Sequence, residues 1–295
     1  LSEHRVATAK TWVKWRMDLL PPNNQEPETS EYVVLARKYR PRDFSTMVGQ
    51  DALVRTLRNA FETGRLAHAF LLAGVRGVGK TTTARIVARA LNCQEDGRTT
   101  PAADPCGQCE SCRAISEDRS VDVLEIDAAS HTGVDNIRDL LEGVKYAPVS
   151  SRYKIYIIDE VHMLSKGAFN ALLKTLEEPP AHVKFLFATT EADRVPITVR
   201  SRCQRFDLRR ISADDLATYF ATLVEKEGVT IDEEALHLIA RAADGSARGG
   251  LSLLDQAIAL SQGRVPSPTA ANFMPSNTSA GRQLSPLDSP NAIAR

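Results

Sequence analysis

The residues from Gly74 to Thr81 read G-x-x-x-x-G-K-T, the pattern of a loop that holds phosphate groups. An apolar run at 70–73 precedes the loop and fits a buried strand, and residues 81–91 read as a helix. The glycines let the backbone turn so that several N–H groups face one anion, and the helix N-terminus adds its partial positive charge. The residues expected to bind a nucleotide here are Gly74, Gly77, Gly79, Lys80, Thr81 and Thr82. Lys80 is expected to reach the β- and γ-phosphates, and the Thr81 hydroxyl to ligate Mg²⁺.

Two carboxylates, Asp159 and Glu160, directly follow an apolar run at 155–158. In phosphate-loop ATPases the acid at such a strand end holds Mg²⁺, which predicts that role for Asp159 together with Thr81. Glu160 would then orient and polarise the attacking water. A strand that ends in two acids is common by itself. Together with a phosphate loop, however, the pair is strong evidence for a hydrolytic site. The two motifs together predict ATP hydrolysis.

Further polar residues follow the later strands. Thr189 and Thr190 end the next apolar run, where either hydroxyl could bond the γ-phosphate or the attacking water; the alternative is an ordinary turn. Arg200, Arg202 and Arg205 lie near the last predicted strand. They form either a solvated basic face or a group from which one arginine reaches the γ-phosphate of a neighbouring subunit. The residue types alone do not decide between the two roles of the threonines, or between the two roles of the arginines.

Four cysteines, spaced Cys93-x12-Cys106-x2-Cys109-x2-Cys112, offer four thiolates. This spacing suits a tetrahedral Zn²⁺ with a closed shell, which predicts a structural zinc site and not a catalytic one. An iron–sulfur cluster and unmetallated thiols are the alternatives. Cys203 lies outside the group and is interpreted as a packing residue. His131 and His162 are interpreted as packing or polar contact residues.

The composition is that of an ordinary globular chain. The 295 residues carry 37 basic and 37 acidic side chains, so net charge gives no argument for nucleic acid, and any DNA contact must come from a local patch. No apolar run approaches the ~20 residues that span a bilayer, and the N-terminus lacks the apolar core of a secretory signal. The clustered cysteines favour a reducing environment. We therefore expect a cytoplasmic protein without a membrane partner.

Strands and helices alternate around these motifs. The expected strands are 70–73, 121–126, 154–158, 183–188 and 204–208, with helices at 51–61, 81–91, 134–144 and after Ser165. This alternation predicts an α/β fold with a five-stranded parallel sheet covered on both faces, and ligands at the carboxyl ends of its strands. From residue 211 the strands stop, and three helices predict a small all-α domain at 211–262.

Both ends differ from this pattern. Residues 1–31 hold a basic amphipathic stretch and a polar linker, and are expected to be an N-terminal extension, partly helical or disordered. The stretch could touch a membrane surface or a partner, or do little. Residues 263–295 are rich in Pro, Ser, Asn and Ala, which predicts a disordered tail.

The motifs resemble the tau/gamma subunits of bacterial DNA polymerase III, which are the AAA+ ATPase motors of the sliding-clamp loader. The matching segments cover about residues 32–260 and read YVVLARKYRP, GVRGVGKTTTARIVARALNC, CGQCESC, EIDAASHTGVDNIRDL, IYIIDEVHMLS, FNALLKTLEEPP, FLFATTE and SRC. The resemblance implies a AAA+ nucleotide-binding domain at 32–210 with sheet order 5-1-4-3-2, a zinc module at 93–112, and a helical lid at 211–262. It implies ATP, Mg²⁺ and Zn²⁺ as cofactors.

The resemblance also implies roles and partners. Thr189 or Thr190 would sense the γ-phosphate, Arg202 of S-R-C would be the arginine finger, and Arg248 would be the sensor from the lid. Tyr32, Arg37 and Arg40-Pro41 would lie near the base and ribose. The implied partners are delta and delta-prime subunits, the sliding clamp, other copies of the chain and primed DNA. ATP binding would build the state that loads the clamp, and hydrolysis would release it; polymerase chemistry is not expected in this chain.

Two departures from the family pattern matter. Gly249-Gly250 stands where the family has Asp-Ala, which predicts a looser start of the lid helix, since a glycine inside a helix costs about 1 kcal/mol relative to alanine. The collar domain of the family is not visible in the polar tail, which predicts weakened or absent ring assembly. The alternatives are a fragment that binds ATP but acts only as a scaffold or stator, and a different AAA+ motor such as a branch-migration helicase. A non-hydrolysing stator would lack Lys80 and Thr81, and the cysteine insertion argues against a helicase.

Overall fold

The computed structural model describes residues 32–130, 133–261 and 264–265. The chain divides into two compact units at residue 34, and the account below concerns the second unit, from residue 35 onward. The predictions for residues 1–31, for His131 and for nearly all of the tail lie outside the described residues. Within the described part, no helix is long and apolar enough to cross a membrane.

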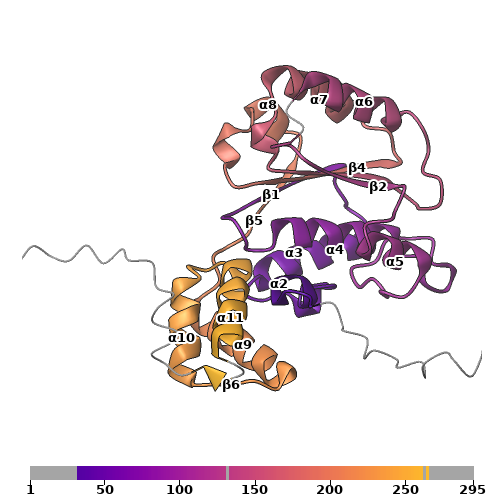
Figure 1. The fold of residues 1–295 in the computed structure, drawn as a ribbon. Coiled ribbons are helices and arrows are strands. Elements are labelled where there is room, and N and C mark those ends of the chain that lie inside the picture. The colour runs from indigo at the N-terminus through magenta and orange to yellow at the C-terminus, as the bar shows by residue number, and fades with distance from the viewer. Residues whose placement is uncertain (1–31, 131–132, 262–263, 266–295) are drawn as a thin grey trace, which may run out of the picture. The chain divides into compact units, whose positions relative to one another are not determined.

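The central element is a five-stranded parallel sheet (Figure 1). Its strands are β1 (Ala69–Ala73), β2 (Val123–Asp127), β3 (Lys154–Asp159), β4 (Val183–Thr189) and β5 (Gln204–Asp207). The order across the sheet is β2-β3-β4-β1-β5, and every pair is parallel. This confirms the predicted five-stranded sheet and the order 5-1-4-3-2.

Helices cover both faces of the sheet, as Figure 1 shows. α3 (Asp51–Glu62) and α4 (Lys80–Asn92) pack on one face, and α6 (Val134–Val144) and α7 (Lys166–Glu177) on the other. Successive strand residues alternate between the two cores: Phe70 and Leu72 face α3 and α4, whereas Ala69 and Leu71 face α6 and α7. Burial on both faces explains why the strands read as continuous apolar runs. Because all five strands are parallel, their carboxyl ends lie at one edge of the sheet, together with the motifs that follow them.

The lid contains three helices, α9 (Ala213–Glu227), α10 (Glu233–Ala242) and α11 (Ala247–Ser261), as predicted. Ser212 caps α9, because its hydroxyl accepts the Asp215 N–H at 3.1 Å. Residues 264–265, assigned from the sequence to the tail, form the short strand β7 (Arg264–Val265), which pairs in parallel with β6 (Thr230–Ile231). Two residues are too few to give a periodic signal.

The two lid glycines lie inside α11, which runs through them without a break. The Ser246 hydroxyl accepts the Gly249 N–H at 3.0 Å. A Cβ at Gly250 would lie 2.3 Å from Cζ of Phe220, a residue that is fully buried in the lid. Gly250 thus allows α9 and α11 to approach closely; whether the start of the helix is looser stays a prediction.

The segment before the sheet packs on the lid. α2 (Leu35–Lys38) places Leu35 in the hydrophobic cluster of the lid, although the sequence assigned this segment to the nucleotide-binding domain. The Tyr39 hydroxyl donates to Glu227 at 2.5 Å, and the Tyr39 carbonyl accepts the Tyr219 hydroxyl at 3.2 Å. Arg40 Nε donates to Thr82 Oγ1 at 3.1 Å, next to the phosphate loop. Residues 35–40 therefore connect the lid to helix α4.

Several short elements have no counterpart in the sequence prediction. They are η1 (Phe44–Thr46), η2 (Glu95–Gly97), α5 (Glu110–Ser116), η3 (Val161–Met163), η4 (Ala192–Arg194) and α8 (Ile197–Arg200). Strand β2 also begins two residues later than predicted. The buried Asp122 accounts for this: its carboxylate accepts the N–H groups of 149–151 and so serves the loop before β3.

Candidate nucleotide-binding and hydrolysis site

The phosphate loop has the positive-φ turns that its glycines allow. Gly77 and Gly79 have φ of 80° and 105°, a region that favours glycine. A Cβ at Gly77 would lie 2.1 Å from Ser246 Oγ, and the Gly77 carbonyl accepts the Arg248 N–H at 3.2 Å. The start of lid helix α11 therefore rests directly on the phosphate loop. Gly77 is needed both for the turn and for this close approach.

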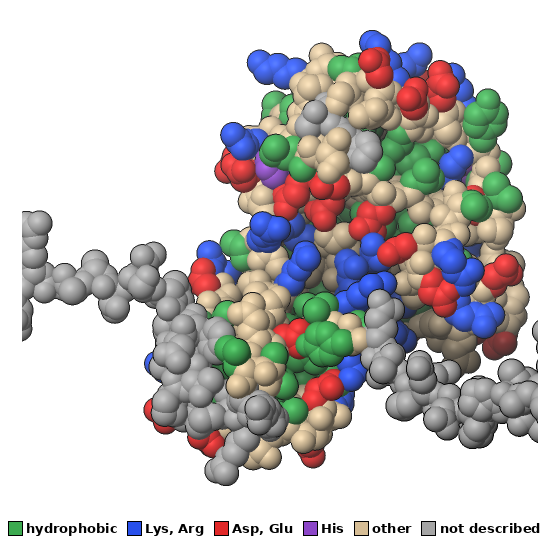
Figure 2. Space-filling view, in the orientation of Figure 1, with side chains coloured by type: hydrophobic (Ala, Val, Ile, Leu, Met, Phe, Trp, Pro, Cys, Tyr) green, Lys and Arg blue, Asp and Glu red, His purple; other side chains and the backbone are tan. Residues whose placement is uncertain are grey.

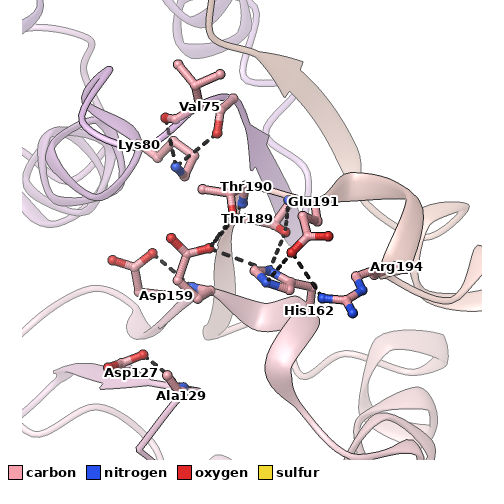
Figure 3. A network of polar contacts seen from close by, with 12 residues as sticks. Val75, Lys80, Asp127, Ala129, Asp159, His162, Thr189, Thr190, Glu191 and Arg194 are labelled. Carbon is pink, nitrogen blue, oxygen red and sulfur yellow. Dashed lines mark hydrogen bonds and ion pairs between the residues drawn. The ribbon is translucent and has the colours of Figure 1, made fainter. Parts of the chain in front are cut away.

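Lys80 is the first residue of α4 and is buried, with 5% of its surface exposed. Its ammonium donates to the carbonyls of Gly74 and Val75 at 3.0 and 3.1 Å (Figure 3). Burial lowers the pKa of Lys80, and the carboxylates of Glu160 and Asp159 oppose that shift. The lysine thus lies within electrostatic reach of both acids, as the sequence predicts for one site.

Thr81 and Asp159, the two predicted magnesium ligands, are in contact. Thr81 Oγ1 donates to Asp159 Oδ2 at 2.6 Å, which joins the start of α4 to the end of β3. Both side chains offer oxygen, the ligand type that Mg²⁺ takes in phosphate sites, where few protein ligands and several waters complete the shell. This pair fits Mg²⁺ bound together with a nucleotide phosphate.

Glu160 adopts a left-handed backbone conformation, with φ 45° and ψ 46°. A non-glycine residue in this region costs on the order of 1 kcal/mol or more, and such strain persists where the surroundings hold it. Glu160 Oε2 accepts both the backbone N–H and the hydroxyl of Thr190, at 3.1 and 2.9 Å. The carboxylate is therefore anchored to the end of β4, beside the phosphate loop.

The two threonines at the end of β4 have different surroundings. The Thr189 side chain is fully buried, and its hydroxyl accepts the Glu191 N–H at 3.0 Å and pairs with His162 Nδ1 at 2.9 Å. Thr190 is half-buried and bonded to Glu160. Thr190 is thus better placed to face a bound phosphate, and Thr189 lies behind it. Sequence reasoning did not place His162 in this network; its only signal was its position two residues after Glu160.

The arginines near β5 bond within their own neighbourhood. Arg202 is 32% exposed and pairs with Glu177 at 2.7 Å. It also donates to the carbonyl of residue 198 at 2.6 Å. Arg200 pairs with Asp193 at 3.0 Å. None of these contacts is with residues 74–82, and both readings of these arginines stay open.

Three arginines from different segments lie close together near the phosphate loop. Burial lowers the pKa of Arg40, which lies near Arg85 and Arg248. Arg248 itself is exposed at the start of the lid helix. Figure 2 shows Lys and Arg side chains gathered near the middle of the visible face, with acidic side chains beside them. Positive charge is therefore available locally in a chain whose net charge is zero.

The four predicted cysteines come together after the end of α4. The Sγ atoms of Cys93, Cys106, Cys109 and Cys112 all lie within 4.8 Å of one another. A tetrahedral Zn²⁺ with Zn–S bonds of about 2.3 Å needs thiolates about 3.8 Å apart, so the donor set and spacing fit zinc. Cys106 Sγ accepts the backbone N–H groups of residues 108 and 109 at 3.4 and 3.2 Å. Burial raises the pKa of the Cys106 thiol, but these bonds, together with hydrogen bonds to the Cys93 and Cys109 thiols, outweigh it and bring that pKa to about 7.

The cysteine cluster is separate from the phosphate site. Cys93 follows the last residue of α4 and Lys80 is the first, so about 20 Å of helix lie between the two. Arg152 ties the cluster to the start of β3: its guanidinium donates to the carbonyl of Cys93 at 3.3 Å and to that of Arg98 at 2.7 Å, and also to that of Leu91. A closed set of four thiolates in this position fits a structural metal.

Two family models match consecutive parts of the chain. Residues 49–212 match the family model described as DNA polymerase III, delta subunit. Residues 215–263 match the model of the ATPase lid domain of the DNA polymerase III clamp loader subunit. The boundary between the two matches coincides with the start of the lid.

Similar curated proteins are subunits of DNA polymerase III. The tau subunit of Salmonella typhimurium is 51% identical over 79% of this chain and 36% of its own length. The tau subunit of Bacillus subtilis is 50% identical over 78% of this chain and 40% of its own length. The gamma subunit of Buchnera aphidicola (subsp. Schizaphis graminum) is 48% identical over 79% and 63%. The aligned part is thus about a third to two thirds of each relative.

Solved structures share the fold at low identity. The Holliday junction branch migration motor RuvB of Thermotoga maritima aligns with a TM-score of 0.58 and 19% identity. The alignment covers 80% of this chain and 72% of that one, and at this identity it shows the AAA+ fold alone. The predicted fold class is confirmed. From the family models and the relatives together, the chain belongs to the DNA polymerase III clamp-loader family, with tau and gamma subunits among its relatives.

Proposed function

We propose that the chain is the ATP-driven motor subunit of a DNA polymerase III clamp loader. The observation that carries the proposal is the meeting of Thr81, Asp159 and Glu160 beside the buried ammonium of Lys80. A non-hydrolysing scaffold has no need of this set. Membership of the clamp-loader family supports clamp loading as the process that ATP hydrolysis drives.

In the proposed reaction, Lys80 and the backbone N–H groups of the loop bind the β- and γ-phosphates. Thr81 and Asp159 would hold Mg²⁺, which when bound neutralises charge on the phosphate oxygens. Glu160 orients the attacking water and accepts its proton, and the bonds from Thr190 fix the carboxylate in place for that task. Thr190 is our candidate for the γ-phosphate sensor, and Arg248 for the sensor from the lid.

The proposed partners are those of the relatives' complex: delta and delta-prime subunits, the sliding clamp, further copies of this chain, and primed DNA. Arg202 would complete the site of an adjacent subunit, where an arginine finger is worth about 10³–10⁵ in turnover. Zn²⁺ would hold the cysteine module, a structural role. We place this work in the cytoplasm, with the replication machinery of which the relatives are subunits.

The test separates ATP binding from hydrolysis. We expect Glu160→Gln to bind ATP with unchanged affinity and to lose hydrolysis by about 10²–10⁴-fold, the usual contribution of a positioned general base. Glu62→Gln, an exposed acid at the end of α3, is the matched control and should hydrolyse ATP as the wild type does. Turnover would be measured with and without clamp, primed DNA and partner subunits. Unchanged hydrolysis in Glu160→Gln would refute the role given to Glu160.

A further inference from the structure

His162 lies in a closed group of polar side chains directly behind Glu160. It is part of η3, and only 5% of its side chain is exposed. Its Nδ1 is 2.9 Å from Thr189 Oγ1 and 3.5 Å from Glu160 Oε2. Its Nε2 is 3.3 Å from Glu191 Oε1. Figure 3 shows the His162 imidazole beside Thr189 and Glu191.

The hydrogen-bond inventory favours one tautomer of this imidazole. The Thr189 hydroxyl accepts the Glu191 N–H, so its own proton is free to be donated to His162 Nδ1. With Nδ1 as acceptor, a neutral ring carries its proton on Nε2, which lies 3.3 Å from Glu191 Oε1, at ion-pair distance. This tautomer satisfies the Thr189 hydroxyl, Nδ1 and the Glu191 amide at once. The contacts Glu191–Thr189–His162–Glu191 then form a closed ring.

This closed ring fixes the backbone that holds Glu160. Thr190 lies between Thr189 and Glu191, the two residues that the imidazole binds, and it supplies both bonds to the Glu160 carboxylate. Glu191 is also paired with Arg194 at 3.0 Å, on the exposed side of the network (Figure 3). Without the imidazole, only the Thr190 bonds to Glu160 among these contacts would join the turn after β4 to the turn after β3, and Thr189 and Glu191 on either side of Thr190 would lose their contact with His162.

We propose that His162 is a positioning residue for ATP hydrolysis: it locks the turn at 189–191 so that Thr190 holds the Glu160 carboxylate at one place. The role rests on the proposed ATPase function, because it acts through Glu160. Misplacing a reacting group by about 1 Å can cost on the order of 10²-fold in rate. Nucleotide binding depends on Lys80 and the loop, which His162 does not contact.

The test compares His162→Ala and His162→Asn with His182→Ala. An asparagine oxygen can replace Nδ1 as acceptor for Thr189, so it restores part of the ring. His182 is a control of the same residue type, bonded to the carbonyl of Val144 at 3.1 Å and outside the network. We expect kcat for ATP to fall about tenfold in His162→Ala, with KM and ATP affinity within twofold of wild type. His162→Asn should recover at least half of that loss on a logarithmic scale, and His182→Ala should be unchanged.

Amide hydrogen exchange gives a second readout that needs no hydrolysis. The Thr190 and Glu191 N–H groups should exchange at least tenfold faster in His162→Ala and at the wild-type rate in His182→Ala. Unchanged exchange at both amides overturns the proposal, and so does a kcat within twofold of wild type, or a raised KM with unchanged kcat. If the wild type itself fails to hydrolyse ATP while exchange responds as expected, the proposed function fails and the positioning of the turn stands.

Discussion

Substitution of Asp122 should destabilise the fold, and the magnitude of the loss can be estimated from the structure. Its carboxylate is fully buried between β2 and the loop before β3. Oδ1 accepts the Val149 N–H at 2.7 Å. Oδ2 accepts the N–H groups of Ser150 and Ser151 at 2.8 and 2.7 Å, and the Ser150 hydroxyl at 3.1 Å. We predict that Asp122→Asn destabilises the nucleotide-binding domain substantially.

The expected cost follows from the best orientation that an asparagine can take. Its oxygen would face the three donors of Ser150 and Ser151, which leaves its NH₂ against the Val149 N–H. One hydrogen bond to a charged acceptor is lost, worth about 1.5–3 kcal/mol, and a buried donor remains without a partner. The other bonds weaken because the acceptor is now neutral. Together we expect a loss of about 2–4 kcal/mol in the free energy of unfolding.

Urea denaturation at pH 7, followed by circular dichroism, measures this loss. The control is Asp135→Asn on α6, where the carboxylate is 91% exposed and forms a surface ion pair with Arg138, so about 0.5 kcal/mol or less is expected. A loss below about 1 kcal/mol for Asp122→Asn would refute the reasoning. Cooperative unfolding in both variants is needed for the comparison.

The pH dependence supplies an independent check. Burial alone would raise the pKa of Asp122, but the hydrogen bonds from residues 149–151 outweigh it and lower the pKa below the ordinary value of 3.8. A lowered folded-state pKa adds stability that is present above the unfolded pKa and is lost as pH falls through the folded pKa. The difference between wild type and Asp122→Asn should therefore shrink below about pH 4. A difference that stays constant down to pH 2 would contradict the assigned cause.

Three further predictions concern the packing of the lid, the metal at the cysteine module, and the contact of Arg202 with an adjacent subunit. Gly250→Ala should cost about 1–3 kcal/mol of lid stability in urea denaturation, since its Cβ would lie 2.3 Å from Phe220. Adding Phe220→Leu to that variant should recover part of this loss, and a purely additive pair would contradict the clash. Removing metal with a chelator should speed amide exchange at 149–153 while β4 stays protected, because Arg152 links the cysteine module to that segment; equal exchange with and without metal would refute the link. Arg202→Ala should lower ATP turnover only in reconstituted assemblies, and an equal loss in the isolated chain would exclude a role at a neighbour's phosphate.

Much of the fold was predictable because the buried strands have a recognisable sequence pattern. β3 and β4 are buried on both faces and therefore read as unbroken apolar runs, and the helices between them show a clear periodicity. The short elements were missed for physical reasons. α5 depends on the cysteine module, where Cys109 Sγ accepts the Cys112 N–H as a helix cap, and no apolar period marks it. The packing of Leu35 on the lid depends on a tertiary contact that local sequence cannot reveal.

The candidate site divides in the same way, between residues that would touch the nucleotide and residues that hold those in place. Lys80, Asp159 and Glu160 follow strand ends in a spacing that the chemistry of phosphate transfer requires, so their types can be interpreted without a structure. His162 and Glu191 have no such constraint on spacing, because each acts through a polar contact that the fold creates between two turns. Thr189 and Thr190 are adjacent and identical in type, and only the fold gives one to the buried imidazole and the other to the carboxylate. Identical side chains can therefore carry different parts of one mechanism, and the difference lies in which side chain of the turn after β3 each one contacts.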